Sequence, residues 1–299
     1  MQLANQSIFH QDWWLEIASE GNWSRIEVVD NQDLIITLPF TIKKKFNLTI
    51  IGQDRYSAFL GPAARIKNEN NKSIDIETSK YYEISEELIS KIPKCSVFAQ
   101  KFSTYVKNTL PWIWCNYSSS SRYTHVLNTL PIKLRSNISA DIKRAKKNNL
   151  IFTKSDNVDK LISMQIKNFK RQKIAYPYKK NIIFLLIEEC IKRKKGNLYS
   201  VYNEYGDILA MNFIVNDLDR KYNLFSARTH EFSNNGAQSY CLSQSINESM
   251  ADGSIFDFEG SMHQGIEKFY RGFNPDVISY QYVEKINSMF LKKLYGLIL

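Results

Sequence analysis

The spacing of apolar residues in the second half of the chain predicts alternating helices and strands. Apolar side chains recur every three or four residues, the period of amphipathic helices, over 158–171, 180–193, 237–250 and 265–272. Strand patterns cover 150–153, 198–202, 208–215, 222–227 and 278–283. The turn Glu204-Tyr205-Gly206-Asp207 predicts a hairpin between two of these strands. The apolar segment 289–299 predicts a closing helix.

The first half shows a similar order of elements. Helical spacing is seen over 9–18, 85–92 (with Ser85 as the N-cap) and 104–109, the last ending near Pro111. Strands are predicted over 24–29, 34–40, 48–51, 96–100 and 122–127, with a turn at 30–33. This order indicates an α+β fold with a mixed sheet, present in two copies. We place the domains at 1–132 and 133–299.

The segment Ile255-Phe-Asp-Phe-Glu-Gly-Ser261 carries the candidate chemistry. Its alternation predicts a strand with Phe256 and Phe258 on one face and Asp257 and Glu259 on the other. A helical pattern follows, so the two acids would lie at the carboxyl end of a strand, where α/β folds keep their sites. The alternative is a solvated edge strand with exposed acids.

The formal charge of +10 suggests an anionic partner, such as nucleic acid, coenzyme phosphates, a sugar nucleotide or a membrane surface. The positive residues form three clusters, which are Lys143 to Lys147, Lys167 to Lys180 and Lys192 to Lys195. A solvated basic helix face explains these clusters equally well.

The remaining composition points to a globular cytoplasmic protein. No run of about 18 apolar residues predicts a membrane helix, and the amino-terminal residues do not resemble a signal peptide. Cys95, Cys115, Cys190 and Cys241 lack metal-type spacing and are interpreted as reduced, mostly core thiols. His10, His125 and His230 have no metal partners at ligand spacing, so no metal is expected.

Several short segments, in this order, resemble the FemAB-like branch of the GNAT acyltransferase superfamily. They are Phe9-His-Gln-Asp-Trp-Trp-Leu15, Ser121-Arg-Tyr-Thr-His125, Ile142-Lys-Arg-Ala-Lys-Lys147, Arg171-Gln172 with Pro177-Tyr178, Phe256-Asp-Phe-Glu-Gly-Ser-Met262 and Ile266-Glu-Lys-Phe-Tyr-Arg-Gly-Phe273. The resemblance covers nearly the whole chain. It implies two tandem GNAT-like acyl-CoA N-acyltransferase domains, a degenerate first one and a second one that carries the site.

The resemblance implies transfer of an acetyl or aminoacyl group to an amine of an amino sugar, an amino acid or a cell-envelope precursor. The donor would be acyl-CoA or aminoacyl-tRNA, and Lys143 to Lys147 together with the lysines around Arg171 would contact the phosphates of a tRNA. A different class of function is also open, namely a non-catalytic module that binds RNA or another partner on a decayed GNAT scaffold.

The attacking amine must lose a proton, which a carboxylate can accept. Glu259 is the first candidate base and Asp257 the second, and their closeness should raise one of the two pKa values. The alternative is that one acid only binds the ammonium group of the acceptor. By resemblance, backbone amides of 222–227 would stabilise the oxyanion, and Tyr270 would protonate the leaving group. Tyr270 as a core aromatic is the alternative.

By resemblance, the segment from Arg228 to Ala237 would cradle the donor phosphates. Arg228, Gly236, Ala237 and Ser226 are the candidate donor-binding residues. The segment lacks a second glycine and contains Glu231, which departs from the CoA-binding pattern and favours an unusual donor such as aminoacyl-tRNA. The candidate substrate-binding residues are Ser261, His263, Arg271, Arg122 and Tyr222.

Overall fold

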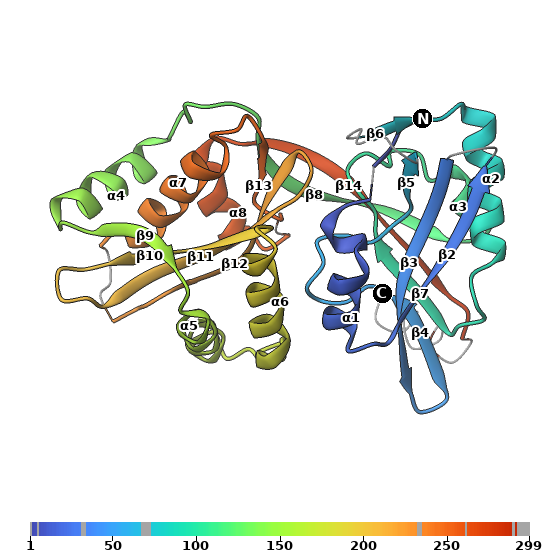
Figure 1. The fold of residues 1–299 in the computed structure, drawn as a ribbon, viewed down its shortest axis with the longest axis horizontal. Coiled ribbons are helices and arrows are strands. Elements are labelled where there is room, and N and C mark those ends of the chain that lie inside the picture. Colours follow the sequence, from blue (N-terminus) through green and yellow to red (C-terminus); the bar gives the residue numbers. More distant parts are fainter. Residues whose placement is uncertain are drawn as a thin grey trace. The chain divides into compact units, whose positions relative to one another are not determined.

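The computed structural model describes residues 2–4, 6–30, 34–66, 73–231, 235–260, 262–288 and 291 (Figure 1). The chain divides into two compact units. The first is Met1–Arg122 together with Ser279–Leu299, and the second is Tyr123–Ile278. This division differs from the predicted boundary at 132/133. The carboxyl-terminal strand joins the first unit because its residues from Tyr282 to Ile286 pair with the strand Val97–Lys101.

The first unit contains a sheet in the order β2-β3-β4-β7-β14. Its elements are β1 (Gln2–Ala4), α1 (Asp12–Ser19), β2 (Trp23–Asp30), β3 (Leu34–Lys45), β4 (Leu48–Gly52), β5 (Ala63–Ile66), β6 (Ser73–Asp75), α2 (Thr78–Ser90), β7 (Val97–Lys101), α3 (Leu110–Trp114) and β14 (Asp276–Ile286). Strands β2, β3 and β4 are antiparallel neighbours, and β7 runs parallel to β4. A hydrophobic core that includes Phe98 and Trp112 lies within this unit.

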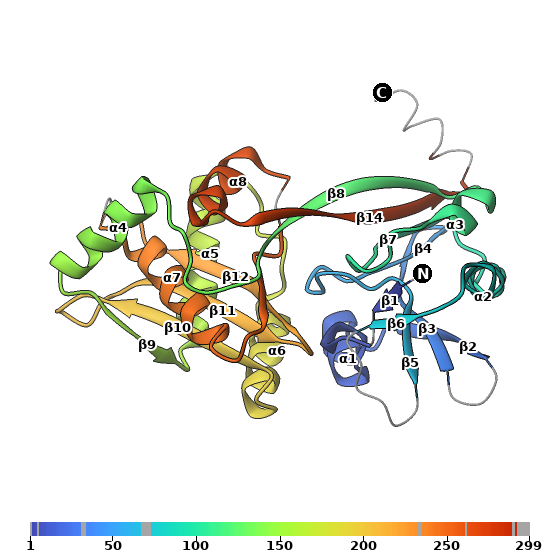
Figure 2. The same cartoon turned by 90° about the horizontal axis from the view of Figure 1, so that it is seen from above.

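The second unit repeats this plan. Its elements are the part of β8 (Ser118–Leu127) from Tyr123 onward, α4 (Ser136–Lys147), β9 (Ile151–Ser155), α5 (Val158–Arg171), α6 (Lys180–Lys192), β10 (Gly196–Tyr202), β11 (Ile208–Asn216), β12 (Arg220–Arg228), α7 (Ala237–Ser249), β13 (Ile255–Asp257) and α8 (Gln264–Tyr270). Strands β10, β11 and β12 run side by side as an antiparallel meander, and β13 is parallel to β12 (Figure 2). The meander, the helix and then a parallel strand recur in both units, which confirms the predicted fold class.

Helices cover both faces of the second sheet. Helices α4 and α7 lie on one face and α5 and α6 on the other (Figure 1). The alternation along β11 explains this, because Ala210 and Ile214 belong to the core under α7, whereas Phe213 stacks with Phe225 on the opposite face. The second unit therefore has a hydrophobic core of its own, and α7 and β12 are held rigidly around it.

Some local predictions are wrong. Residues 104–109 contain no helix, and Pro111 lies in the first turn of α3 instead of ending a helix, because proline at that position loses no hydrogen bond. Helix α2 begins at Thr78, so Ser85 is a buried residue within it and not an N-cap. Helix α4 was expected only as a basic cluster. The predicted turn at 30–33 lies mostly outside the described residues, and nearly all of the predicted helix 289–299 does too.

Candidate active site

Strands β12 and β13 begin as a pair and then separate. Three pairs join them, from Arg220↔Ile255 to Tyr222↔Asp257, after which β13 ends while β12 continues to Arg228. Beyond this point, the edge of β12 that faces β13 pairs with no strand in the described part of the chain. In a strand, every second backbone N–H points to that edge. The separation therefore opens a gap beside β12 in which backbone amides are available to a ligand.

A cavity of about 320 Å³ fills this gap. Its lining residues come from β12, α5, α7 and the helix that follows β13; they are Asn168, Ser226, Ala227, Arg228, Gln238, Leu242, Gly265, Ile266, Phe269 and Tyr270. Apolar side chains of α8 lie across from the polar edge of β12. We call this cavity the reaction pocket, because it combines an apolar wall with backbone donors, which is typical of small-ligand sites.

Tyr270 places a phenol in the reaction pocket. Its ring packs on Phe258 with centroids 4.7 Å apart. Burial raises the pKa of Tyr270 above its ordinary value, and the nearby negative charge of Glu259 raises this pKa further, against the opposing effect of a hydrogen bond with the Asn223 side chain. The phenol therefore keeps its proton at neutral pH.

Asp257 does not project into the reaction pocket. Its carboxylate is 3% exposed and accepts hydrogen bonds from Thr124 Oγ1 at 2.6 Å, Arg220 Nη1 at 2.9 Å and the Glu259 backbone N–H at 2.8 Å. The expectation that Asp257 and Glu259 share one strand face is wrong, because the strand stops at Asp257. These three contacts anchor the turn that follows β13.

Glu259 lies in that turn, half-buried, with φ 58°, and Gly260 follows with φ 55°. A left-handed backbone is unfavourable for a residue with a side chain, and such strain clusters at functional sites. Gly260 is required here, because a Cβ at this position would lie 2.6 Å from the Tyr123 carbonyl oxygen. The carboxylate of Glu259 is close enough to Tyr270 to raise the pKa of the phenol. Glu259 is the more exposed of the two acids, and neither acid is among the described residues that line the reaction pocket.

His125 is a neighbour of Tyr270 that the sequence did not single out for this site. Its ring centroid lies 6.1 Å from that of Tyr270, and Nε2 lies 3.9 Å from Glu267 Oε1. Its Nδ1 is buried and has no hydrogen-bond partner among the described residues. Burial lowers the pKa of His125, against an opposing effect of Glu267, so the ring is neutral at pH 7. The alternating pattern of a strand does not reveal that its histidine lies next to a tyrosine of a distant helix.

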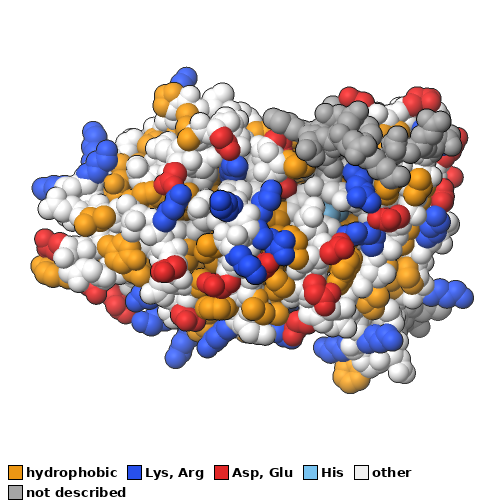
Figure 3. Space-filling view, viewed as in Figure 1, with side chains coloured by type: hydrophobic (Ala, Val, Ile, Leu, Met, Phe, Trp, Pro, Cys, Tyr) orange, Lys and Arg blue, Asp and Glu red, His pale blue; other side chains and the backbone are white. Residues whose placement is uncertain are grey.

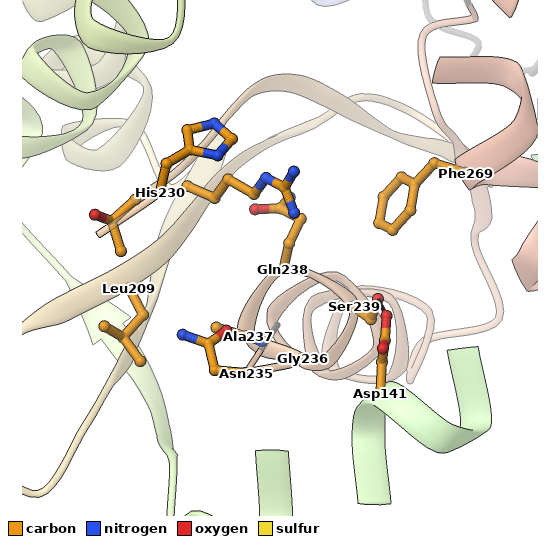
Figure 4. A pocket seen from close by; sticks show the side chains of 11 residues that line it. Asp141, Leu209, His230, Asn235, Gly236, Ala237, Gln238, Ser239 and Phe269 are labelled. Atoms are coloured by element: carbon orange, nitrogen blue, oxygen red, sulfur yellow. Dashed lines mark hydrogen bonds between the residues drawn. The ribbon is translucent and has the colours of Figure 1, made fainter. Parts of the chain in front are cut away.

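A second cavity, of about 200 Å³, lies at the beginning of α7 and brings Arg228, Gly236 and Ala237 together. Figure 4 shows Asp141 next to Ser239 and Asn235 next to Ala237. Asp141 Oδ2 accepts a hydrogen bond from Ser239 Oγ at 2.7 Å, and Asn235 Oδ1 accepts one from the Ala237 N–H at 2.9 Å. A Cβ on Gly236 would lie 2.1 Å from the Asp141 carbonyl oxygen.

These contacts do not fit the pyrophosphate of CoA. A helix N-terminus binds an anion through free N–H groups. At α7, a carboxylate from α4 already lies at this terminus and would repel a phosphate. The first helical N–H is also satisfied by Asn235. Arg228 lines both this cavity and the reaction pocket, and Ser226 lines the reaction pocket. Their role in donor binding stays a prediction.

A third cavity, of about 300 Å³, has a basic wall formed by α5. Lys160, Lys167 and Arg171 line it at helical spacing, together with Arg228 and His230 from the end of β12 and beyond. Glu231 pairs with Lys167 at 3.4 Å, but both side chains are largely exposed. Asn168 and Arg228 line this cavity as well as the reaction pocket. We call it the basic groove.

The other predicted substrate-binding residues are dispersed. Arg122 belongs to the first unit and stacks on Tyr282 at 3.9 Å. Arg271 pairs with Glu267 at 2.9 Å, and His263 is the N-cap residue of α8. Tyr222 is a buried residue of β12, and burial raises its pKa well above the ordinary value. Ser261 lies outside the described residues.

Within the described ranges, no group of three or more His, Cys, Asp or Glu side chains is arranged to hold a metal ion. His10 is buried against the Leu60 and Gly61 carbonyls, and burial lowers its pKa to about 4.

The four cysteines are free, and Cys190 and Cys241 are buried as predicted. No helix in the described part of the chain is long and apolar enough to cross a membrane.

Comparison with solved structures finds close similarity of fold at low identity. FemX matches with a TM-score of 0.70 and 12% identity, over 98% of this chain and 95% of that one. L-PGS from Bacillus licheniformis matches with a TM-score of 0.60 and 11% identity, over 94% and 89%. The C-terminal domain of a putative lysylphosphatidylglycerol synthetase from Agrobacterium fabrum gives 0.56 and 8%, over 91% and 86%.

No protein-family model and no curated protein matches the sequence. Identities of this size establish the fold alone. At that level they agree with the resemblance found in the sequence, because the chain shares the fold of FemX over nearly the whole length of both chains.

Proposed function

We propose that the protein transfers an aminoacyl or other acyl group from an activated donor to an amine, and that the reaction takes place in the reaction pocket. The observation that carries this proposal is the gap between β12 and β13, which sets the free edge of β12 opposite the phenol of Tyr270. The oxyanion and the leaving group are two different substituents of the reacting carbon, and each needs its own donor. In this proposal, the wall formed by β12 supplies N–H donors for the oxyanion, and the wall formed by α8 supplies the Tyr270 hydroxyl for the leaving group.

In the proposed reaction, the amine nitrogen attacks the carbonyl carbon and forms a C–N bond. Backbone N–H groups of β12 near Ser226 and Ala227 stabilise the oxyanion. When the tetrahedral intermediate collapses, the bond from carbon to the leaving oxygen or sulfur breaks, and Tyr270 gives that atom its proton. Glu259 accepts the proton that the nitrogen loses, directly or through water. Asp257 and Arg220 position Glu259 through the turn that they hold.

The donor that these contacts favour is aminoacyl-tRNA. The start of α7 is a poor site for pyrophosphate, whereas the basic groove adjoins the reaction pocket and places three cations along α5. Over α5, Lys160 to Arg171 spans roughly 16 Å at 1.5 Å per residue, which suits two or three successive phosphates of a single strand. A fold neighbour named as a putative lysylphosphatidylglycerol synthetase also points to an aminoacyl donor. For the acceptor, we propose an amine on an amino sugar, an amino acid or a cell-envelope precursor.

The donor is tested with the purified chain, a radiolabelled aminoacyl-tRNA and, in parallel, radiolabelled acetyl-CoA, each with a panel of amine acceptors. We expect label transfer from aminoacyl-tRNA. Lys167→Gln with Arg171→Gln should raise KM for this donor about tenfold and lower the slope of log Kd against log salt by about 1 to 2, because two phosphate contacts are lost.

The control for this experiment is Lys192→Gln with Lys194→Gln, two exposed lysines outside the basic groove, which should leave KM within twofold. Turnover with acetyl-CoA alone would contradict the proposed donor. Salt-dependent tRNA binding without turnover on any acceptor would favour the non-catalytic binding module.

A further inference from the structure

The hairpin of β3 and β4 extends beyond the sheet of the first unit. The last pair of β3 with β2 is Thr41↔Trp23, and the first pair of β4 with β7 is Ile50↔Val97. Beyond these pairs the hairpin continues as a two-stranded ribbon, whose last pairs are Lys44↔Thr49 and Lys45↔Leu48. Figure 1 shows this hairpin reaching past the ends of its neighbouring strands. We call residues 43–47 the hairpin tip.

The hairpin tip combines positive charge with one exposed aromatic ring. Lys43, Lys44 and Lys45 are exposed and have no ion pair with any described residue. Because side chains alternate along a strand, Lys43 and Lys45 point to one face of the ribbon and Lys44 to the other. Phe46 is 91% exposed at the apex. Figure 3 shows a hydrophobic side chain flanked by basic ones at this projecting end.

The backbone shows that Phe46 is kept at an unfavourable position. Phe46 and Asn47 form a two-residue loop, and φ of Phe46 is 53°. Glycine is the usual residue where the first position of such a loop has a positive φ, and a bulky side chain there is uncommon. Neither solubility nor the geometry of the turn explains an aromatic residue at this place. Contact with an apolar partner does.

We propose that the hairpin tip docks onto an anionic lipid bilayer, with the Phe46 ring in the interface and the three ammonium groups at the headgroups. Basic side chains around an apolar anchor are the pattern of peripheral membrane binding. The projecting ribbon can approach a flat surface without contact by the rest of its unit. A single-stranded nucleic acid needs a groove that follows its backbone, and a ribbon two strands wide offers none. This surface is independent of the reaction pocket.

The test is co-sedimentation of the full chain with vesicles of phosphatidylglycerol and phosphatidylcholine, compared with vesicles of phosphatidylcholine alone. We expect binding to the anionic vesicles only. Replacing Lys43, Lys44 and Lys45 together by glutamine should weaken it about 100-fold, and Phe46→Gly about tenfold or more. The control replaces the exposed Lys192, Lys194 and Lys195 by glutamine, with an equal loss of charge, and should change binding less than threefold.

Thermal unfolding separates a loss of binding from a loss of fold. Phe46→Gly removes the strained side chain, so its Tm should equal or exceed that of the wild type while its binding falls. The proposal is overturned by equal binding to both kinds of vesicle, by binding that the tip variants leave unchanged, or by a control variant that is equally impaired. Binding of the tip to a single-stranded RNA instead of vesicles would also overturn it.

Discussion

Replacing Glu259 by glutamine should lower kcat for acyl transfer by about 100-fold or more. Glutamine keeps the size of the side chain but cannot accept a proton from the attacking nitrogen, and a positioned base contributes about 10² to 10⁴ in rate. The turn should survive, because its anchor is the backbone N–H of Glu259 bound to Asp257, which the substitution keeps. The measurement is the initial rate of label transfer at saturating donor and acceptor.

Glu248 provides a matched control for this prediction. It lies in α7, pairs with Lys154 at 3.0 Å and is 40% exposed on its side chain, away from the reaction pocket. Glu248→Gln should keep kcat within twofold of the wild type. A Glu259→Gln variant with wild-type kcat and an unchanged melting temperature would remove Glu259 from the role of base.

Replacing Arg220 by methionine should destabilise the second unit by about 3–5 kcal/mol. The Arg220–Asp257 ion pair is buried, with side chains 7% and 4% exposed. Removing the cation leaves a charged carboxylate inside the protein, which keeps Thr124 and the Glu259 N–H as its hydrogen-bond donors among the described residues. The measurement is the free energy of unfolding from urea titration, monitored by far-UV circular dichroism.

The neighbouring residue of β12 supplies the comparison. Lys221 pairs with Asp252 at 3.0 Å, and the Asp252 side chain is 58% exposed. Water can solvate the Asp252 carboxylate when the lysine is removed. Lys221→Met should therefore lower the free energy of unfolding by less than about 1 kcal/mol. Adding Asp257→Asn to Arg220→Met should recover part of the loss, since an amide carries no charge. A loss below 1 kcal/mol for Arg220→Met would show that the ion pair does not hold the turn.

The order of helices and strands was predictable because local periodicity records it. The hairpin of β10 and β11, the helices α5 to α7 and the strand–helix unit at 255–270 all follow apolar patterns that the structure confirms. The end of β13 was not predictable. The alternation of apolar and acidic residues continues in the sequence through Glu259. In the structure, the Phe258 N–H donates to the His125 carbonyl, and Glu259 and Gly260 then adopt a left-handed backbone conformation.

The partners of the site residues come from distant parts of the chain. Asp257 meets Arg220 across 37 positions and Thr124 across 133, so its burial as an ion pair has no local signal. Asp141 reaches Ser239 across 98 positions and fills the start of α7. The helix that carries Tyr270 was predicted from its local apolar pattern, whereas a role for Tyr270 at the site came only from the family resemblance and stays a prediction.

The most direct test of the central claim is the single-turnover rate of acyl transfer for Tyr270→Phe, measured by rapid quench with donor bound in advance. The claim is that the gap between β12 and β13 is the reaction centre and that Tyr270 protonates the leaving group there. We predict a rate at least about 100-fold below the wild type with donor affinity within threefold. A wild-type rate for Tyr270→Phe would contradict the claim.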